Sequence, residues 1–132
     1  MKLLNADKMI AINVAIMSEN RQKTFIRNLK GLKSIVALPK QSVFGHQMDE
    51  TLAEQIGMMF IKIINLHPFE DGNKRTAVIA AQIISRLNHM ELTFTNQQIR
   101  DLALLVAKTD DPYLNYQDVF TQFERHLQLL AK

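Results

Sequence analysis

Apolar residues recur at spacings of three and four along most of the chain, which is the pattern of one buried face of an α-helix. The clearest stretch spans residues 51–66, where Thr51 and Glu54 form a capping-box pattern at the start. We therefore predict a long helix here, central to the core. Its apolar positions are Leu52, Ile56, Met59, Phe60, Ile63 and Ile64.

Five further helices are predicted around this one. Two of them precede the helix at residues 51–66. Pro39 should end the second of these, residues 29–38, because proline disfavours the α conformation in the preceding residue. Thr95 and Gln98 form another capping-box pattern, and Asn115 is placed to cap a final helix that carries apolar residues as far as Leu130. The predicted ranges are 7–17, 29–38, 72–88, 95–108 and 115–130.

Two short segments depart from the helical pattern. Residues 91–94 are expected to be extended, and residues 39–47 to form an exposed loop or small hairpin that could serve as a flap. A length of 132 residues suits one core, so we expect a single domain, residues 1–132. The predicted fold class is all-α, a compact bundle of about six helices with a small flap.

The composition excludes several kinds of site and partner. The chain has no cysteine, which excludes disulfides, thiolate catalysis and cysteine-bound zinc. Its net charge of +3 is spread along the sequence, and the densest basic stretch reads as a solvated helical face, so direct nucleic-acid binding is not expected. The sequence has neither a signal-peptide core nor an apolar run of membrane-spanning length, so we expect a cytoplasmic location without membrane association.

The segment from His67 to Arg75 has no apolar period, although it joins the two strongest core helices. Loops that rigid elements hold in this way often carry binding or catalytic residues. Pro68 and Phe69 are predicted to anchor the loop, with Phe69 packed into the core. Gly72 would allow a positive φ or the close approach of a ligand.

The other loop residues suit nucleotide chemistry. Backbone N–H groups of residues 72–74 would open a helix N-terminus, which attracts anions, and Lys74 and Arg75 add positive charge where phosphate oxygens would lie. Asp71 offers the hard oxygen ligand that Mg²⁺ prefers. The imidazole of His67 is suited to accept a proton from an incoming hydroxyl near neutral pH.

Each of these residues also has a plain structural interpretation. His67 could interact with a helix C-terminus, Asp71 and Asn73 could cap the next helix, and Arg75 could form a surface ion pair. Taken singly, these interpretations compete with the functional ones. The combination of all of them within nine residues favours function.

These residues resemble the Fic motif, His-Pro-Phe-x-(Asp/Glu)-Gly-Asn-(Gly/Lys)-Arg, at every specified position. The similarity to the death-on-curing branch of the Fic superfamily includes Gly31-Leu32 and residues 39–45 before the loop, and Thr76-Ala77 after it. The resemblance implies a Fic-like fold and an enzyme that transfers a phosphoryl or nucleotidyl group from ATP or another NTP onto a protein, with Mg²⁺.

The resemblance also implies residue roles. His67, Asp71 and Arg75 would be the catalytic residues, with His67 as the base and Asp71 as the Mg²⁺ ligand. The flap would register a target peptide beside the site by strand addition. The phosphate-binding nest would comprise Gly72, Asn73, Lys74 and Arg75, and the flap would comprise Lys40, Gln41, Ser42, Val43 and Phe44.

Two departures favour phosphorylation over adenylylation. Adenylylating members usually have Gly where this chain has Lys74, and a second Arg where it has Val78. That Arg holds the distal phosphates, so without it the nucleotide could lie reversed and present its γ-phosphate. The resemblance then implies a death-on-curing toxin, a protein kinase acting on a threonine of elongation factor Tu. An AMP transferase and a non-catalytic peptide-binding module remain alternatives.

The sequence also indicates how the activity would be inhibited. Fic proteins that silence themselves carry Ser/Thr-x-x-x-Glu-Gly/Asn, and the nearest match, from Ala15 to Asn20, lacks the hydroxyl. The arginine that such a glutamate would pair with is also missing, so Glu19 is interpreted as a surface residue. Inhibition is expected instead from a small antitoxin protein whose disordered tail folds as a helix into a groove.

Overall fold

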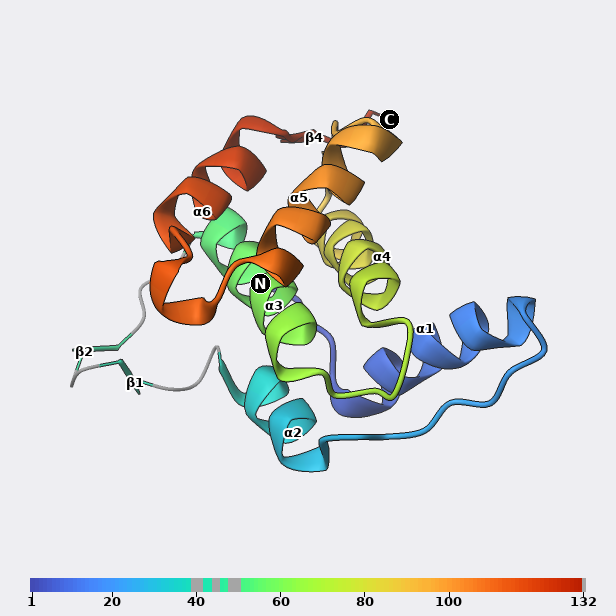
Figure 1. Ribbon diagram of the computed structural model, residues 1–132. Coiled ribbons are helices and arrows are strands. Elements are labelled where there is room, and N and C mark those ends of the chain that lie inside the picture. Colours follow the sequence, from blue (N-terminus) through green and yellow to red (C-terminus); the bar gives the residue numbers. More distant parts are fainter. Residues whose placement is uncertain (39–41, 44–45, 48–50, 132) are drawn as a thin grey trace.

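The computed structural model describes residues 1–38, 42–43, 46–47 and 51–131. Within these residues the chain forms six α-helices and two very small sheets (Figure 1), which confirms the predicted all-α bundle. The helices are α1 (Ala6–Glu19), α2 (Leu29–Ala37), α3 (Leu52–Leu66), α4 (Asn73–Leu87), α5 (Asn96–Lys108) and α6 (Tyr116–Arg125), and the 3₁₀ turn η2 (Asp111–Tyr113) precedes α6.

Helix α3 is central, as its apolar pattern predicts. It packs against α2, α4, α5 and α6, while α1 packs against α4. In the view of Figure 1, α1 and α2 lie below α3 and α4, and α5 and α6 lie above them. The loop between α3 and α4 therefore emerges on the side of α1 and α2.

Aromatic packing joins α3 to α6. The ring of Phe123 meets that of Phe60 edge to face at 5.1 Å, and Phe94 packs against Phe123 in the same manner at 5.4 Å. Gly57 lets the two helices approach closely, because a Cβ there would lie 2.7 Å from Phe120. Phe60 and Phe123 are fully buried, so this contact is part of the apolar core.

The flap contains a small hairpin in its described part. Strand β1 (Ser42–Val43) pairs antiparallel with β2 (His46–Gln47), with Ser42 opposite Gln47. The predicted loop or hairpin is thus a hairpin at these four residues. Lys40, Gln41 and Phe44 lie outside the described residues.

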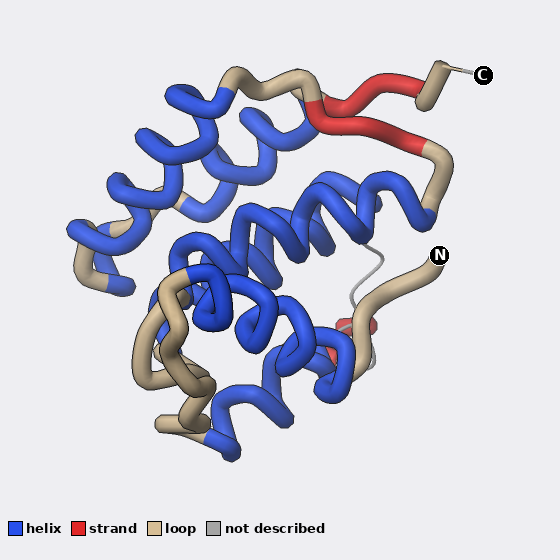
Figure 2. Tube along the Cα trace, turned by 90° about the vertical axis from the view of Figure 1, so that its right-hand side faces the viewer, coloured by secondary structure: helices blue, strands red, loops and turns tan. Residues whose placement is uncertain are grey.

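The prediction that the last helix continues to Leu130 is wrong. Helix α6 ends at Arg125, and Leu127–Leu129 forms β4, which pairs antiparallel with β3 (Met90–Leu92) at one end of the bundle (Figure 2). Thr93 donates its backbone N–H to the carbonyl of His126 at 2.7 Å, and the His126 ring stacks on Phe94. Pairing with a segment distant in sequence therefore outweighs the local helical pattern.

Candidate functional site

The N-terminus of α4 differs from those of the other five α-helices in the described chain. Each of those five begins with a polar side chain that accepts a hydrogen bond from the third helical residue, and the caps are Asn5, Asn28, Thr51, Thr95 and Asn115. Helix α4 begins at Gly72, which provides no side-chain cap. Its first-turn N–H groups are therefore left for another partner.

The charges at this helix end make the contrast stronger. The first turn of α4 contains no acidic residue, yet it carries the exposed cations Lys74 and Arg75. Cations near a helix N-terminus are unfavourable, because that end already carries positive partial charge. An uncapped helix end with two added cations is suited to bind a phosphate group.

Backbone contacts hold the loop before α4 in place. Pro68 is buried and Phe69 is fully buried. The carbonyl of Pro68 accepts the N–H of Arg27 at 2.9 Å, and the N–H of Glu70 donates to the carbonyl of Phe25 at 2.9 Å. The segment after α1 thus pairs with the loop like a short strand, and it restrains the loop along its outer edge.

Two buried asparagines complete this restraint. Asn73 uses its side chain to bond both backbone groups of Phe69, accepting from the N–H at 3.0 Å and donating to the carbonyl at 2.8 Å. Asn13 of α1, which has no exposed surface, donates to the carbonyl of Asp71 at 2.9 Å and to the hydroxyl of Thr76 at 3.2 Å. The side chain of Asn73 therefore braces the loop, and only its backbone N–H is directed to the helix end.

Sequence reasoning missed Asn13 as a residue of the site. In the sequence Asn13 only weakens the apolar stripe of the first helix, whereas the structure shows its oxygen accepting the Thr24 hydroxyl at 2.9 Å. It thereby joins the segment after α1 to the loop. The available signal was a polar side chain on the buried face of a helix, since buried amides require hydrogen-bond partners.

Gly72 is required by its conformation and by its surroundings. Its φ of 77° lies in the left-handed region, and a Cβ there would lie 3.1 Å from Nδ2 of Asn13 and 3.3 Å from Sδ of Met17. Any other residue would be strained in this conformation and would crowd the Asn13 brace. The turn into α4 consequently depends on glycine.

His67 is exposed at the C-terminal end of α3 in an uncommon backbone conformation. Its φ of 47° and ψ of 62° are left-handed, a conformation that costs a non-glycine residue about 1–3 kcal/mol and is concentrated at functional sites. Its ring forms no hydrogen bond with another described residue. The imidazole therefore faces solvent, where an incoming hydroxyl could reach it.

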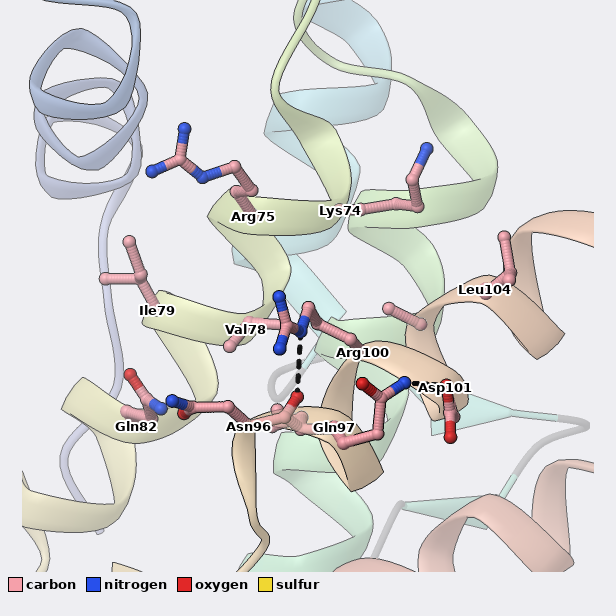
Figure 3. A pocket seen from close by; sticks show the side chains of 12 residues that line it. Lys74, Arg75, Val78, Ile79, Gln82, Asn96, Gln97, Arg100, Asp101 and Leu104 are labelled. Atoms are coloured by element: carbon pink, nitrogen blue, oxygen red, sulfur yellow. Dashed lines mark hydrogen bonds between the residues drawn. The ribbon is translucent and has the colours of Figure 1, made fainter. Parts of the chain in front are cut away.

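The loop residues fall on two sides of the first turn of α4. Asp71 is exposed and lines a cavity of about 380 Å³ beside α1. Lys74 and Arg75 line a larger groove of about 670 Å³ between α4 and α5 (Figure 3). The loop thus places its carboxylate and its cations around one helix end.

Arg75 has a partner that sequence reasoning did not predict. Its guanidinium donates to the carboxylate of Glu19 at 2.8 Å, from the last turn of α1. About half of the Arg75 side chain and two-thirds of that of Glu19 are exposed, so solvent screens the pair and its net worth is about 0–1 kcal/mol. Glu19 is a surface residue, as interpreted, but it contacts the site.

The donor set around Asp71 fits Mg²⁺ shared with a nucleotide. One carboxylate oxygen of Asp71 accepts the N–H of Gly72 at 2.7 Å, which orients the group at the helix end. Among the described residues no three His, Asp or Glu side chains gather into a metal cage. Mg²⁺ is commonly held by one or two carboxylates with phosphate oxygens and water, so the single carboxylate of Asp71 would suffice with a phosphate at the start of α4.

The family model described as the Fic/DOC family matches residues 3–85, which includes α1 and the whole loop. The chain belongs to the Fic/DOC family. No curated protein matches the chain. Proteins of the Fic/DOC family transfer groups from nucleotides to protein targets, using an NTP and typically Mg²⁺. In the described part of this Fic/DOC chain, no helix has both the length and the apolar character needed to cross a membrane.

Proposed function

We propose that this protein is a death-on-curing toxin, a kinase that transfers the γ-phosphate of ATP to a threonine of a translation factor similar to elongation factor Tu. The observation that carries the nucleotide part is the start of α4, where Gly72 provides no side-chain cap, two cations lie in the first turn, and the carboxylate of Asp71 lies just before it. The loop is also rigidly braced, and phosphoryl transfer depends mainly on positioning and charge neutralisation.

The preference for phosphorylation rests on Lys74 and Val78. Both line the groove that begins at the first turn of α4, so both would influence how a nucleotide lies there. An apolar Val78 cannot hold distal phosphates, and Lys74 places an ammonium group where adenylylating relatives usually have glycine. These features support the orientation that presents the γ-phosphate to the target.

In the proposed reaction His67 accepts the proton of the target hydroxyl. The hydroxyl oxygen forms a bond to the γ-phosphorus, the bond from phosphorus to the bridging oxygen breaks, and ADP leaves with that electron pair. The backbone N–H groups of Asn73 and Lys74, together with Arg75, neutralise the phosphate oxygens, and the N–H of Gly72 joins them once it leaves the Asp71 carboxylate. Asp71 would hold Mg²⁺, which supplies further charge neutralisation when bound.

Two protein partners belong to the proposal. The target peptide is aligned by the flap, through residues 40–44, and the β1–β2 hairpin provides an edge for strand addition. A small antitoxin inhibits the enzyme by folding a helix into a groove, and the apolar cavity of about 380 Å³ between α1 and α4 supports such a mode. Because the target is a translation factor, the protein would act in the cytoplasm.

Intact-mass measurement of purified elongation factor Tu after incubation with the protein and Mg-ATP tests the proposal directly. We expect the mass of one phosphoryl group to be gained, with label transferred from the γ position of ATP. Gain of AMP, with label from the α position, would instead make the protein an AMP transferase. An unmodified target beside a competent control kinase contradicts the kinase proposal for this target.

Two histidine variants provide a matched pair. His67→Ala should lower the turnover number by roughly 10²–10⁴-fold, because a general base contributes about that much. His89→Ala should leave it unchanged, although His89 is also exposed and has a positive φ of 61°. If the cellular phenotype survives His67→Ala, the protein acts as a non-catalytic binding module.

A further inference from the structure

The groove between α4 and α5 contains a third cation that is outside the loop motif. Arg100 lies in the second turn of α5, lines the groove and is exposed. Figure 3 shows its guanidinium extending from α5 toward α4 and ending beside Val78. Its Nε donates to the backbone carbonyl of Asn96 at 3.2 Å, and within the described chain the terminal nitrogens have no hydrogen-bond partner.

The charge of the groove favours an anionic ligand. Lys74, Arg75 and Arg100 contribute positive charges to its lining, while the guanidinium of Arg75 is paired with Glu19 of α1, and the groove holds the single carboxylate of Asp101. That carboxylate accepts a hydrogen bond from Nε2 of Gln97 at 2.7 Å, and no carboxylate of a described residue lies within 4.0 Å of Arg100. The guanidinium of Arg100 is therefore held in the groove without a protein counter-charge.

The position of Arg100 along the groove matches a chain of phosphates that starts at the loop. In Figure 3 Leu104 of α5 lies toward Lys74, and Asn96 lies toward Gln82, so α5 runs opposite to α4. Val78 is five residues beyond the start of α4, which corresponds to about 7.5 Å of helix. A phosphate bound at the helix end would thus have its linked phosphates directed toward Arg100.

We propose that Arg100 binds the leaving-group phosphates of the nucleotide, the ones that are not transferred. This inference rests on the proposed function. The attacked phosphorus must lie near His67, so the phosphates farther along the groove belong to the leaving group, whether that group is ADP or pyrophosphate. When the bond to the bridging oxygen breaks, the leaving group gains negative charge, and the guanidinium of Arg100 stabilises it.

Arg100 approaches the groove from α5 and does not replace a charge at position 78. Val78 lines the apolar floor of the groove with Ile79 and Ile99, and in the proposed γ-transfer orientation the phosphates that meet Arg100 are those of ADP. A planar guanidinium can donate two parallel hydrogen bonds to phosphate, which lysine cannot. Arg100 is therefore a nucleotide-binding residue that the loop motif does not contain.

Calorimetric titration of the whole protein with four probes tests this assignment. The probes are Mg-ATP, Mg-ADP, inorganic triphosphate with Mg²⁺, and adenosine. Arg100→Gln should weaken the binding of the three phosphate-containing probes by roughly 10-fold or more and leave that of adenosine unchanged. Arg100→Lys should recover part of the loss. Arg86→Gln, which removes an exposed arginine of α4 outside the groove, should bind as the wild type does.

Turnover measured with the same variants provides a second readout. Arg100→Gln should lower the turnover number more than it raises KM, because the leaving-group charge grows in the transition state. Its melting temperature should match the wild type, since Arg100 is exposed. If Arg100→Gln binds Mg-ATP as tightly as the wild type while Lys74→Gln binds it weakly, the role of Arg100 is overturned and the proposed function stands. If the wild type binds no phosphate-containing probe, both fail.

Discussion

The contact between α3 and α6 and the loop between α3 and α4 both rest on buried side chains, but different forces hold them. Phe60, Phe123 and Gly57 join the two helices through apolar packing, with rings 5.1 Å apart, and the helices also share one hydrogen bond from Lys62 to the Tyr116 hydroxyl. The loop is held by hydrogen bonds from two buried asparagines, Asn13 and Asn73, and by backbone pairing with the segment after α1. The first region stabilises the fold, whereas the second would position the residues of the proposed reaction.

The difference shows how polar bracing would serve the proposed active-site loop. Apolar packing is non-directional, so it holds a helix in place without fixing the orientation of individual backbone groups. A buried amide with three partners fixes both the distance and the orientation of the backbone that it holds. We therefore expect substitutions in the apolar region to change stability alone, and substitutions in the polar region to change activity as well.

Truncation in the aromatic contact should have the largest effect on stability. Phe123→Ala removes a fully buried ring that contacts both Phe60 and Phe94, and should lower the free energy of unfolding by about 3–5 kcal/mol. Phe25→Ala, at a residue with 62% of its surface exposed, is the matched control and should cost far less. Urea denaturation gives both values. A lower turnover number per folded Phe123→Ala molecule would contradict the separation of the two regions.

Loss of the Asn13 brace should have an intermediate effect on stability. Asn13→Leu leaves the buried Thr76 hydroxyl, the half-buried Thr24 hydroxyl and the Asp71 carbonyl without this partner, at a cost of about 1–3 kcal/mol. It should also lower the turnover number at a temperature where the protein is folded. A double-mutant cycle with Thr24→Val measures the coupling by denaturation. Strictly additive effects would show that the hydrogen bond between the two side chains contributes nothing.

Two glycine substitutions compare the regions directly. Gly72→Ala strains a left-handed residue at a cost of about 1–2 kcal/mol and should also reduce Mg-ATP binding, because it displaces the Asn13 amide from the loop. Gly57→Ala meets Phe120 at 2.7 Å and should cost about 1–3 kcal/mol without affecting binding. Thermal melting and calorimetry separate the two outcomes. Equal loss of Mg-ATP affinity in both variants would remove the distinction.

The ion pair between Glu19 and Arg75 should have a smaller effect. Arg75 must leave the carboxylate to bind phosphate, so Glu19→Gln should tighten Mg-ATP binding by up to about 5-fold, the equivalent of at most about 1 kcal/mol. Stability should hardly change. Because both side chains are exposed, the gain should shrink as salt is added. Unchanged affinity at low salt would show that the pair does not compete with the nucleotide.

A polar network that joins Lys62 of α3, Asp111 of η2 and Tyr116 of α6 should give the smallest effect, and one that depends on pH. Burial raises the pKa of the Tyr116 hydroxyl above its usual value of about 10, and its hydrogen bond with Asp111 raises it further, against the opposing effect of Lys62. The folded state therefore favours the neutral phenol. The stability difference between wild type and Tyr116→Phe, about 1 kcal/mol, should hold below pH 10 and decline as the pH rises through the folded pKa. Denaturation at several pH values checks this.

Five of the six described helices were predictable to within about two residues, because their signals are local. Thr51 and Thr95 cap α3 and α5 as expected, with a full capping box only at Thr95. The same reasoning failed after Arg125, where β4 pairs with a segment more than thirty residues earlier. No local pattern encodes such a partner, and a run of leucines suits a helix and a strand equally well.

The sequence by itself determined the helical bundle and the loop motif, since periodicity and residue order are written in one dimension. Tertiary structure alone decided that Asn13 of α1 braces the loop, that Glu19 reaches Arg75, and that Arg100 faces Val78 across a groove. Each of these relations joins side chains from different helices, so it exists only after those helices have packed. Packing of apolar faces brings them together, and the polar residues at the margins of those faces then meet.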